Sequence, residues 1–352
     1  MKSEFSEKLL MWNTLQNNRP MPWKGETDPY KIWLSEIILQ QTRVEQGWKY
    51  YEAFISTFPT VTDLAQAQDA VVFKLWEGLG YYSRCRNLLL TARYIAHERD
   101  GQFPGTYDEL IKLKGIGAYT AAAIASFAFK ECRAVVDGNV QRIISRYFGI
   151  NTPTDTGAGK KLYQELAQAM IDEEQPDIYN QAIMDFGATV CKPRQPLCLS
   201  CVQKDDCEAF RLGVVESLPV KEKKLIKKER WFSYYLIETP TSVYVRQRNS
   251  RDIWNSLHEF ILMETKHAPD EHAHQVFLQQ LLQSAAYQIT AISPPVRQIL
   301  SHQVIHGRFI HVALQTEAVN IPGYVAIARE SLAALAFPGL INSYLLHHAK
   351  VF

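Results

Sequence analysis

Four of the six cysteines in this chain fall within one short segment, and this cluster constrains the fold more than any other feature of the sequence. The segment has the spacing C-x6-C-x2-C-x5-C, and its cysteines are Cys191, Cys198, Cys201 and Cys207. Four thiolates this close in sequence favour a single tetrahedral or cubane metal centre. Zinc and iron–sulfur both remain open from the spacing. The single unsymmetrical loop favours iron–sulfur, because zinc ligands usually come as two from each of two short loops.

The N-terminal segment and the hydropathy of the chain indicate whether these cysteines are reduced or form disulfides. Residues 1–16 carry acidic groups and have neither a long apolar core nor a small-residue cleavage site, so we expect no signal peptide. No run is long and apolar enough to cross a membrane. We therefore expect a cytoplasmic, nucleoid-associated protein in a reducing compartment, where cysteines act as free thiols or metal ligands rather than disulfides.

The apolar pattern changes near residue 212 and predicts two domains. Up to that point, apolar residues recur at three- and four-residue spacing, which predicts an all-α region over 1–212. A charged stretch, VKEKKLIKKER at 220–230, cannot bury a core face, so we place a linker at 213–228. Beyond it we expect an α+β domain over 229–352. Its predicted strands lie near 231–239, 242–248 and 308–316, and its predicted helices near 271–286 and 326–336.

A glycine-flanked turn between helical segments is a candidate phosphate site. The segment LKGIGAYTA, at 113–121, places Gly115 and Gly117 on either side of Ile116. Glycine permits a positive φ and close backbone approach, and the following helix presents N–H groups that no preceding turn satisfies. A glycine C-cap in an ordinary helical hairpin is the alternative. Since the net charge is only +1, nucleic acid would be held by such local features rather than by a generally basic surface.

Two carboxylates stand in patterns that suit acid and ion-pair chemistry. Glu36 lies in IWLSEIILQQT, so a helix that buries the surrounding apolar residues would carry its carboxyl group into a low-dielectric cleft and raise its pKa. Asp137 precedes a glycine and an apolar run in VVDGNVQRII, which is typical of a helix N-cap. Each residue alone also fits a solvated or capping role.

These motifs in order resemble the endonuclease III and MutY family of DNA glycosylases. The cysteine spacing, LKGIGAYTA, SEIILQQT and VDGNV all match, and independent motifs in the right order are hard to obtain by chance. The resemblance implies that the four cysteines hold a [4Fe-4S] cluster, with Lys192 and Arg194 as phosphate contacts. It implies a helix-hairpin-helix near 110–121 that contacts DNA through Gly115, Ile116 and Gly117, where carbonyls can also hold a monovalent cation.

The resemblance also assigns catalytic roles. Glu36 would protonate adenine, and Asp137 would stabilise the sugar oxocarbenium ion or capture it covalently, as carboxylate pairs do in glycoside hydrolysis. Endonuclease III enzymes carry a Schiff-base lysine two residues after the second hairpin glycine, where this chain has Tyr119. Base removal without strand cleavage therefore follows from the resemblance. Tyr119 would organise Asp137, and Asn139 matches an active-site amide.

Further residues are implied as contacts to the mispair, because base extrusion needs a pocket and a wedge. The wedge beside oxidised guanine would be Gln41 and Tyr81. Arg84 and Arg86 would contact phosphates. The adenine pocket would be lined by Lys24, Leu39, Val44, Gln181 and Asp185.

The C-terminal region resembles a Nudix-like recognition domain. No REx2EE-type helix for magnesium is evident in it. Ser301 and His302 stand in the family's recognition loop, where Leu300 replaces a phenylalanine.

We therefore expect a monomeric, monofunctional glycosylase that binds double-stranded DNA and removes adenine opposite 8-oxoguanine or guanine. A bifunctional endonuclease III-type glycosylase/lyase and a non-catalytic DNA damage-binding protein are the alternatives. Tyr119 and the added C-terminal region oppose the first, and a loss of base release on replacing Glu36 would oppose the second.

Overall fold

The structure, a computed structural model, describes residues 4–222, 227–249, 252–315 and 319–347. The chain forms two compact units. Unit 1 comprises Met1–Gln66 and Asn87–Lys224, and unit 2 comprises Ala67–Arg86 and Leu225–Phe352. The predicted linker at 213–228 includes residues 223–226, which lie outside the described residues. The predicted domain boundaries stay a prediction.

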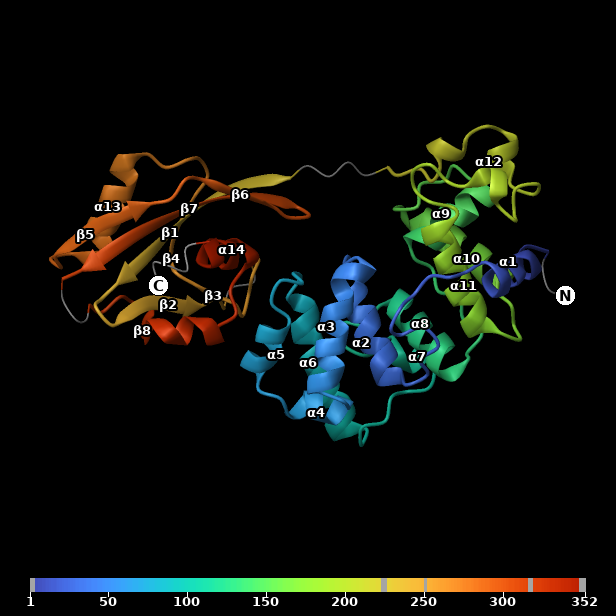
Figure 1. Cartoon of the computed structure of the whole chain (residues 1–352), viewed down its shortest axis with the longest axis horizontal. Helices are drawn as coiled ribbons and strands as arrows, with labels where there is room; N and C mark the ends of the chain where they lie inside the picture. The colour runs from blue at the N-terminus through green and yellow to red at the C-terminus, as the bar shows by residue number, and fades with distance from the viewer. Residues whose placement is uncertain (1–3, 223–226, 250–251, 316–318, 348–352) are drawn as a thin grey trace. The chain divides into compact units, whose positions relative to one another are not determined.

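Unit 1 is helical, as the apolar spacing predicts (Figure 1). Its first part holds α1 (Glu4–Leu15), α2 (Pro29–Leu39), α3 (Val44–Thr57) and α4 (Val61–Gln66). Helix α6 (Ser83–Glu98) begins in unit 2 and continues into unit 1. The remaining helices are α7 (Tyr107–Leu110), α8 (Ala118–Phe129), α9 (Gly138–Tyr147), α10 (Gly157–Met170), α11 (Pro176–Thr189) and α12 (Glu208–Arg211), with 3₁₀ turns η1 (Cys198–Ser200) and η2 (Val215–Ser217).

Local capping and one shared core fix these helices. Asp28 accepts a hydrogen bond from the Tyr30 amide, and a proline opens α2 at its first position, so the helix starts sharply there. Helix α9 has the highly amphipathic sequence GNVQRIISRY. Its apolar face packs with residues of α1, α8, α10 and α11 around buried side chains such as Trp12, Tyr163 and Phe186. This core holds α8, α9 and α11, which carry most of the candidate site.

Unit 2 contains α5 (Asp69–Leu75) and a mixed sheet, which agrees with the predicted α+β class. Strands β1 (Lys228–Glu238) and β7 (Gln303–Leu314) run parallel at its centre, and the other neighbours pair antiparallel. The outer strands are β2 (Ser242–Gln247), β3 (His258–Glu259), β4 (Ile261–Thr265), β5 (Tyr287–Ile292), β6 (Val296–Ile299) and β8 (Val325–Ala328).

The two faces of this sheet bury different residues, as the two-residue period of strands requires. On one face, Tyr235 and Ile310 pack with Leu278 of α13 (Glu271–Leu282). On the other, Tyr234 and Phe309 pack with Ile341 of α14 (Gly339–His347). The central strands are therefore covered on both sides.

One predicted helix in this region is wrong. Residues 326–336 form the end of β8 and the 3₁₀ turn η3 (Arg329–Ala334) instead of an α-helix. Val325 to Ala328 pair antiparallel with β2, and sheet pairing of this kind overrides local helix propensity. In the described part of the chain, no helix combines the length and the apolar character needed to traverse a lipid bilayer.

Candidate active site

Glu36 is a buried carboxyl group in the third turn of α2. Its neighbours Ile32, Trp33 and Ile37 are buried, and Glu36 itself is only 7% exposed. Burial raises the pKa of Glu36 to about 7, because a carboxylate loses hydration in this environment. A hydrogen bond from the Tyr119 hydroxyl opposes this rise, and the nearby charge of Asp137 adds to it. Glu36 therefore holds a proton at near-neutral pH.

Asp137 occupies the N-cap of α9 and faces the same environment. One carboxylate oxygen accepts from the Val140 amide at 2.8 Å, and the other accepts from Asn139 Nδ2 at 2.7 Å. Burial raises the pKa of Asp137, while these hydrogen bonds lower it. Tyr119 is near both carboxyl groups. Burial raises the pKa of its hydroxyl well above the usual value, and the charges of Glu36 and Asp137 add to this rise. The structure thus brings the predicted set Glu36, Asp137, Tyr119 and Asn139 together.

Arg142 holds Asn139 in place, and sequence reasoning missed it. Its Nη2 donates to Asn139 Oδ1 at 2.8 Å and to the Gly187 carbonyl at 2.7 Å, and its Nε donates to the Cys191 carbonyl at 2.8 Å. With its amide oxygen taken, Asn139 turns its NH₂ group toward Asp137. A continuous chain of hydrogen bonds therefore leads from the cysteine loop to the Asp137 carboxylate.

Gly187 allows the close approach of α11 to α9 that this chain of contacts needs. A Cβ atom at position 187 would lie 2.6 Å from Cβ of Asn139. Such a contact would push the two helices apart.

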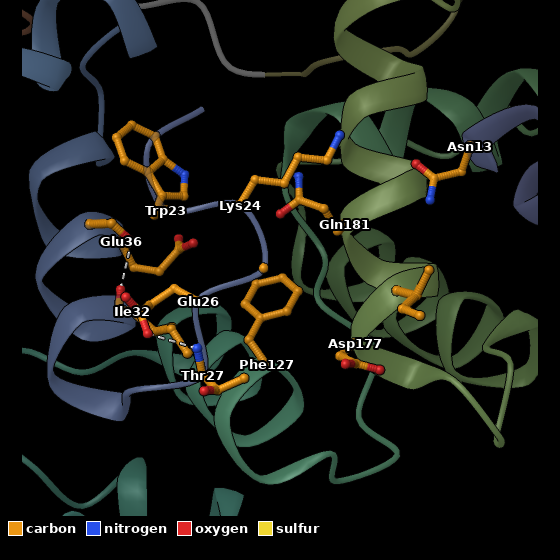
Figure 2. A pocket seen from close by; sticks show the side chains of 13 residues that line it. Asn13, Trp23, Lys24, Glu26, Thr27, Ile32, Glu36, Phe127, Asp177 and Gln181 are labelled. Carbon is orange, nitrogen blue, oxygen red and sulfur yellow. Dashed lines mark hydrogen bonds between the residues drawn. The ribbon is translucent and has the colours of Figure 1, made fainter. Parts of the chain in front are cut away.

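A cavity of about 320 Å³ opens beside Glu36, as Figure 2 shows. Glu36 on α2 and Gln181 on α11 approach it from opposite sides, and Lys24 lies between them (Figure 2). Its lining also includes Asn13, Trp23, Glu26, Thr27, Ile32, Phe127, Asp177 and Ile178. Most of these belong to no motif, and only the fold could identify them. Aromatic rings with a few polar groups suit a planar, hydrogen-bonding ligand.

The other predicted pocket residues take different positions. Asp185 is not among the lining residues and is fully buried, where it accepts from Arg19 Nη1 (2.9 Å), Lys24 Nζ (3.2 Å) and Gln181 Nε2 (3.0 Å). It therefore positions two lining side chains. Leu39 and Val44 are not among the lining residues. Leu39 lies at the end of α2, close to Gly47 of α3.

The predicted phosphate turn has the expected geometry for close backbone approach. Gly115 adopts a φ of +78°, and a Cβ there would collide with the Asn87 side chain at 2.5 Å. Gly117 is the N-cap residue of α8, and Ile116 between them is buried. The amides of the first turn of α8 have no helical carbonyl to pair with, so they can bind an anion.

A second cavity, of about 450 Å³, lies within unit 2. Tyr81, Leu300, Ser301 and His302 line it, and the hydroxyl groups of Tyr81 and Ser301 contact each other. The predicted wedge tyrosine and recognition loop are therefore side by side. Gln41 is not part of this lining. It is exposed in unit 1, at the end of α2, with a left-handed φ of 60°.

Arg84 supports the turn that carries Tyr81, and Arg86 contacts a loop of the sheet region. The Arg84 guanidinium lies over the Tyr81 ring at 5.5 Å and donates to the Gly80 carbonyl at 3.3 Å. Arg86 Nη1 donates to the Asn255 carbonyl at 2.8 Å. The structure thus gives both arginines contacts within unit 2.

The four clustered cysteines line one small cavity of about 30 Å³ in unit 1. Arg146 closes it, with Nη1 3.4 Å from Cys191 Sγ. Nowhere in the described ranges are three or more His, Cys, Asp or Glu side chains arranged so that they could hold a metal ion as they stand. Four sulfur donors around one cavity suit a soft metal centre, but the thiols would have to converge to bind it.

The comparisons define the class of protein. Residues 34–168 match the HhH-GPD superfamily of base excision DNA repair proteins. A solved structure titled as a thermostable thymine-DNA glycosylase is 28% identical, with a TM-score of 0.55 over 59% of this chain and 95% of that one.

Two curated relatives show which kind of DNA glycosylase this chain resembles. An adenine DNA glycosylase from Buchnera aphidicola (Schizaphis graminum) is 35% identical over 74% of this chain and 76% of its own length. The human adenine DNA glycosylase is 41% identical over 58% of this chain and 39% of its own length. The chain belongs to the adenine DNA glycosylase family.

Removal of the Tyr119 hydroxyl should raise the pKa of Glu36. The hydrogen bond from Tyr119 favours the ionised carboxylate, so Tyr119→Phe is expected to move the Glu36 titration above its midpoint near 7. A ¹³C NMR titration of selectively labelled glutamate carboxyl groups measures this shift. Tyr94→Phe, at an exposed tyrosine, is the control. An unchanged or lower midpoint in Tyr119→Phe contradicts the arrangement.

Proposed function

We propose that this protein is a monofunctional adenine DNA glycosylase of base excision repair, which removes adenine mispaired with 8-oxoguanine or guanine. The observation that carries the proposal is the buried Glu36 in the lining of a cavity, with a pKa raised to about 7 and with Asp137 close enough to influence it. Membership of the adenine DNA glycosylase family supports adenine as the base released.

Glu36 is the proton donor in this proposal. Adenine is a poor leaving group until a ring nitrogen is protonated, and a general acid with a pKa near the working pH is the most effective donor. Burial gives Glu36 a pKa of about 7. After the base leaves, the Glu36 carboxylate can accept a proton from the attacking water.

Asp137 faces the sugar in this proposal. Departure of the base leaves positive charge on the deoxyribose, which an ionised carboxylate stabilises or traps covalently. The hydrogen bonds from Asn139 and the Val140 amide favour the ionised form of Asp137. Burial raises the pKa of both carboxyl groups, and Asp137 accepts more hydrogen bonds that oppose this rise, so in this proposal Asp137 acts as the ionised partner of Glu36.

Tyr119 supports base removal without strand cleavage. The hydroxyl donates a hydrogen bond to Glu36 and has no amine with which to form a Schiff base. The bifunctional alternative requires such an amine. Borohydride reduction during turnover should therefore leave no covalent protein–DNA adduct, whereas a lyase would be trapped.

The excision assay that tests the function uses three duplexes, with adenine opposite 8-oxoguanine, guanine or thymine. Alkali then cleaves the strand at any abasic site. We expect cleavage at adenine in the first two duplexes and none in the third. Release from the adenine–thymine pair contradicts the proposed specificity, and no release from any duplex favours a DNA-binding protein without glycosylase activity.

We further propose that Cys191, Cys198, Cys201 and Cys207 hold a [4Fe-4S] cluster. All four line the same cavity, next to the buried Arg146, whose cationic side chain suits a group bound by thiolates. The cluster would tie η1 and α12 to the end of α11. In this proposal it is structural, and every step of base removal belongs to the side chains of the pocket.

Loss of one cysteine of the loop should remove the iron and destabilise unit 1. We expect Cys198→Ala to be purified colourless and iron-poor, with a lower thermal midpoint, because the free energy of binding a metal centre also stabilises the folded state that holds it. Cys132→Ala, outside the loop, is the matched control and should stay brown. Iron, sulfide and zinc analysis of both variants gives the readout. Zinc without iron in the wild-type protein contradicts the proposal.

In this proposal unit 2 helps to recognise the mispair. Its resemblance to Nudix proteins would concern the fold and not their hydrolase activity. Its buried acid Glu259 is bound by Arg248 Nη1 at 2.5 Å and by Arg246 Nε at 2.8 Å. Arg230 likewise binds both Asp252 and Glu264. Acids neutralised by arginines are poor ligands for magnesium, which argues against a hydrolase role. The hairpin at Gly115–Gly117 would hold a DNA phosphate, with or without a monovalent cation.

A further inference from the structure

We propose that Trp254 is a specificity-determining residue, which supplies the flat surface that a base of the mispaired strand contacts in the cavity of unit 2. The inference rests on the proposed function and extends it to a residue outside every motif considered above. Trp254 lines the 450 Å³ cavity together with Tyr81, Ser301 and His302. These are the residues assigned to the wedge and the recognition loop. Trp254 therefore lies where the base opposite the excised adenine would be recognised.

The backbone at Trp254 has an unfavourable conformation that the surrounding structure must hold in place. Its φ is +60°, in the left-handed region that bulky side chains rarely adopt, and Ser256 two residues later has a φ of +72°. Glycine would take such a conformation at lower cost. A tryptophan held in a strained turn beside a cavity is the kind of backbone outlier that points to a functional surface.

Hydrogen bonds hold this turn rigidly. The Arg248 amide donates to the Leu257 carbonyl at 2.8 Å, the Ser256 amide donates to the Arg248 carbonyl at 2.8 Å, and Arg248 Nε donates to the Ile253 carbonyl at 3.1 Å. From the other side, Arg86 Nη1 donates to the Asn255 carbonyl at 2.8 Å. The ring of Trp254 also packs edge-on against the buried Phe232, with centroids 5.7 Å apart. The indole is therefore preorganised, which lowers the entropy lost on binding.

Leu300 explains why a second aromatic residue is needed. It occupies the loop position where an aromatic side chain would otherwise stand, and its own side chain packs against the same hydrophobic cluster as Trp254. The Leu300 amide is also bound by the Gln303 carbonyl at 2.8 Å, which keeps the loop tight. Leu300 has no flat face to offer a base. The tyrosine and tryptophan side chains in the lining of this cavity are Tyr81, Tyr82 and Trp254. Tyr82 is buried and stacks on Phe73, which leaves Tyr81 and Trp254 as the rings that can contact a base.

The chemistry of the cavity suits a purine. Two aromatic rings can contact a base face, while the Ser301 hydroxyl, the His302 imidazole and the Asn255 amide can bond to its edge. A purine opposite adenine, guanine or its 8-oxo form, has that combination of a broad face and a polar edge. We therefore propose that Trp254 contacts the purine base opposite the excised adenine.

The test compares Trp254→Met with Trp254→Phe. Methionine fills the space against Phe232 with a flexible apolar chain but has no flat ring, whereas phenylalanine keeps one. Affinity is measured for duplexes that carry a 2′-fluoro-adenosine, which resists excision, opposite 8-oxoguanine, guanine or thymine. We expect Trp254→Met to lose about tenfold of the preference for 8-oxoguanine over thymine, and Trp254→Phe to keep most of it. Thermal unfolding of both variants checks that each is folded.

A fluorescence measurement adds a readout that does not depend on affinity. With 2-aminopurine opposite the 2′-fluoro-adenosine, stacking on Trp254 should quench its emission, and Trp254→Phe should quench less. Equal affinity ratios in all three proteins, or emission that is unaffected by binding, would overturn the assignment. Failure of adenine release by the wild-type protein would instead contradict the proposed function, so the two outcomes remain distinguishable.

Discussion

Glu36→Gln is expected to lower the single-turnover rate of adenine release by on the order of 10³-fold, within the range that general acids contribute. Glutamine keeps the size of the side chain and can still accept a hydrogen bond from Tyr119, but it cannot deliver a proton. Binding to a duplex with adenine opposite 8-oxoguanine should stay close to that of the wild-type protein. Rapid-quench assays with enzyme in excess measure the rate, and gel-shift titration measures binding.

Glu98→Gln, at an exposed position at the end of α6, is the control for a change of one charge on unit 1. It should leave both quantities unchanged. If Glu36→Gln released adenine at a rate within threefold of the wild-type protein, Glu36 would not be the acid.

Asp137→Asn is expected to lower the rate by on the order of 10²- to 10³-fold, as removal of one electrostatic stabiliser does elsewhere. Asparagine can still cap α9 by accepting from the Val140 amide, so the fold should persist. It carries no negative charge to face the sugar cation. Its NH₂ group would also oppose that of Asn139.

The chain offers a matched control for the capping part of this change. Asp270 is the N-cap of α13 and accepts from the Ala273 amide at 2.8 Å, as Asp137 does from Val140. Asp270→Asn should leave excision intact and change the thermal midpoint about as much as Asp137→Asn does. Equal loss of activity in both variants would mean that capping, and not charge at the sugar, explains the effect.

Local patterns in the sequence predicted the elements that carry the candidate site. The apolar spacing identified α2 around Glu36, and the Asp-Gly pair identified the start of α9. The proximity of Glu36, Tyr119 and Asp137 could not follow from these patterns, because it depends on how α2, α8 and α9 pack around one core. The resemblance to a known family supplied the pairing that periodicity alone could not.

Long-range contacts account for most of what sequence reasoning missed. Arg142 follows the VDGNV motif, but nothing in the local pattern marks it, because its role depends on contacts with Asn139, Gly187 and Cys191. Residues 67–86 cluster with unit 2, although they are far from it in sequence. In the sequence, nothing distinguishes Trp254 from an ordinary aromatic residue in a turn, because its positive φ and its place in the cavity lining are tertiary features. Such features arise from tertiary packing, which local propensity does not encode.

The pH dependence of single-turnover adenine release by the wild-type protein tests the central claim most directly. Because the protonated form of Glu36 is the active form in this proposal and its pKa is about 7, the rate should approach its plateau about one pH unit below that midpoint and be about half of it near pH 7. Above that midpoint it should fall by about tenfold per pH unit as the carboxyl group ionises. Glu36→Gln should show no such fall in its residual rate. A wild-type rate that stays constant or rises between about pH 7 and pH 9 would contradict proton delivery by Glu36.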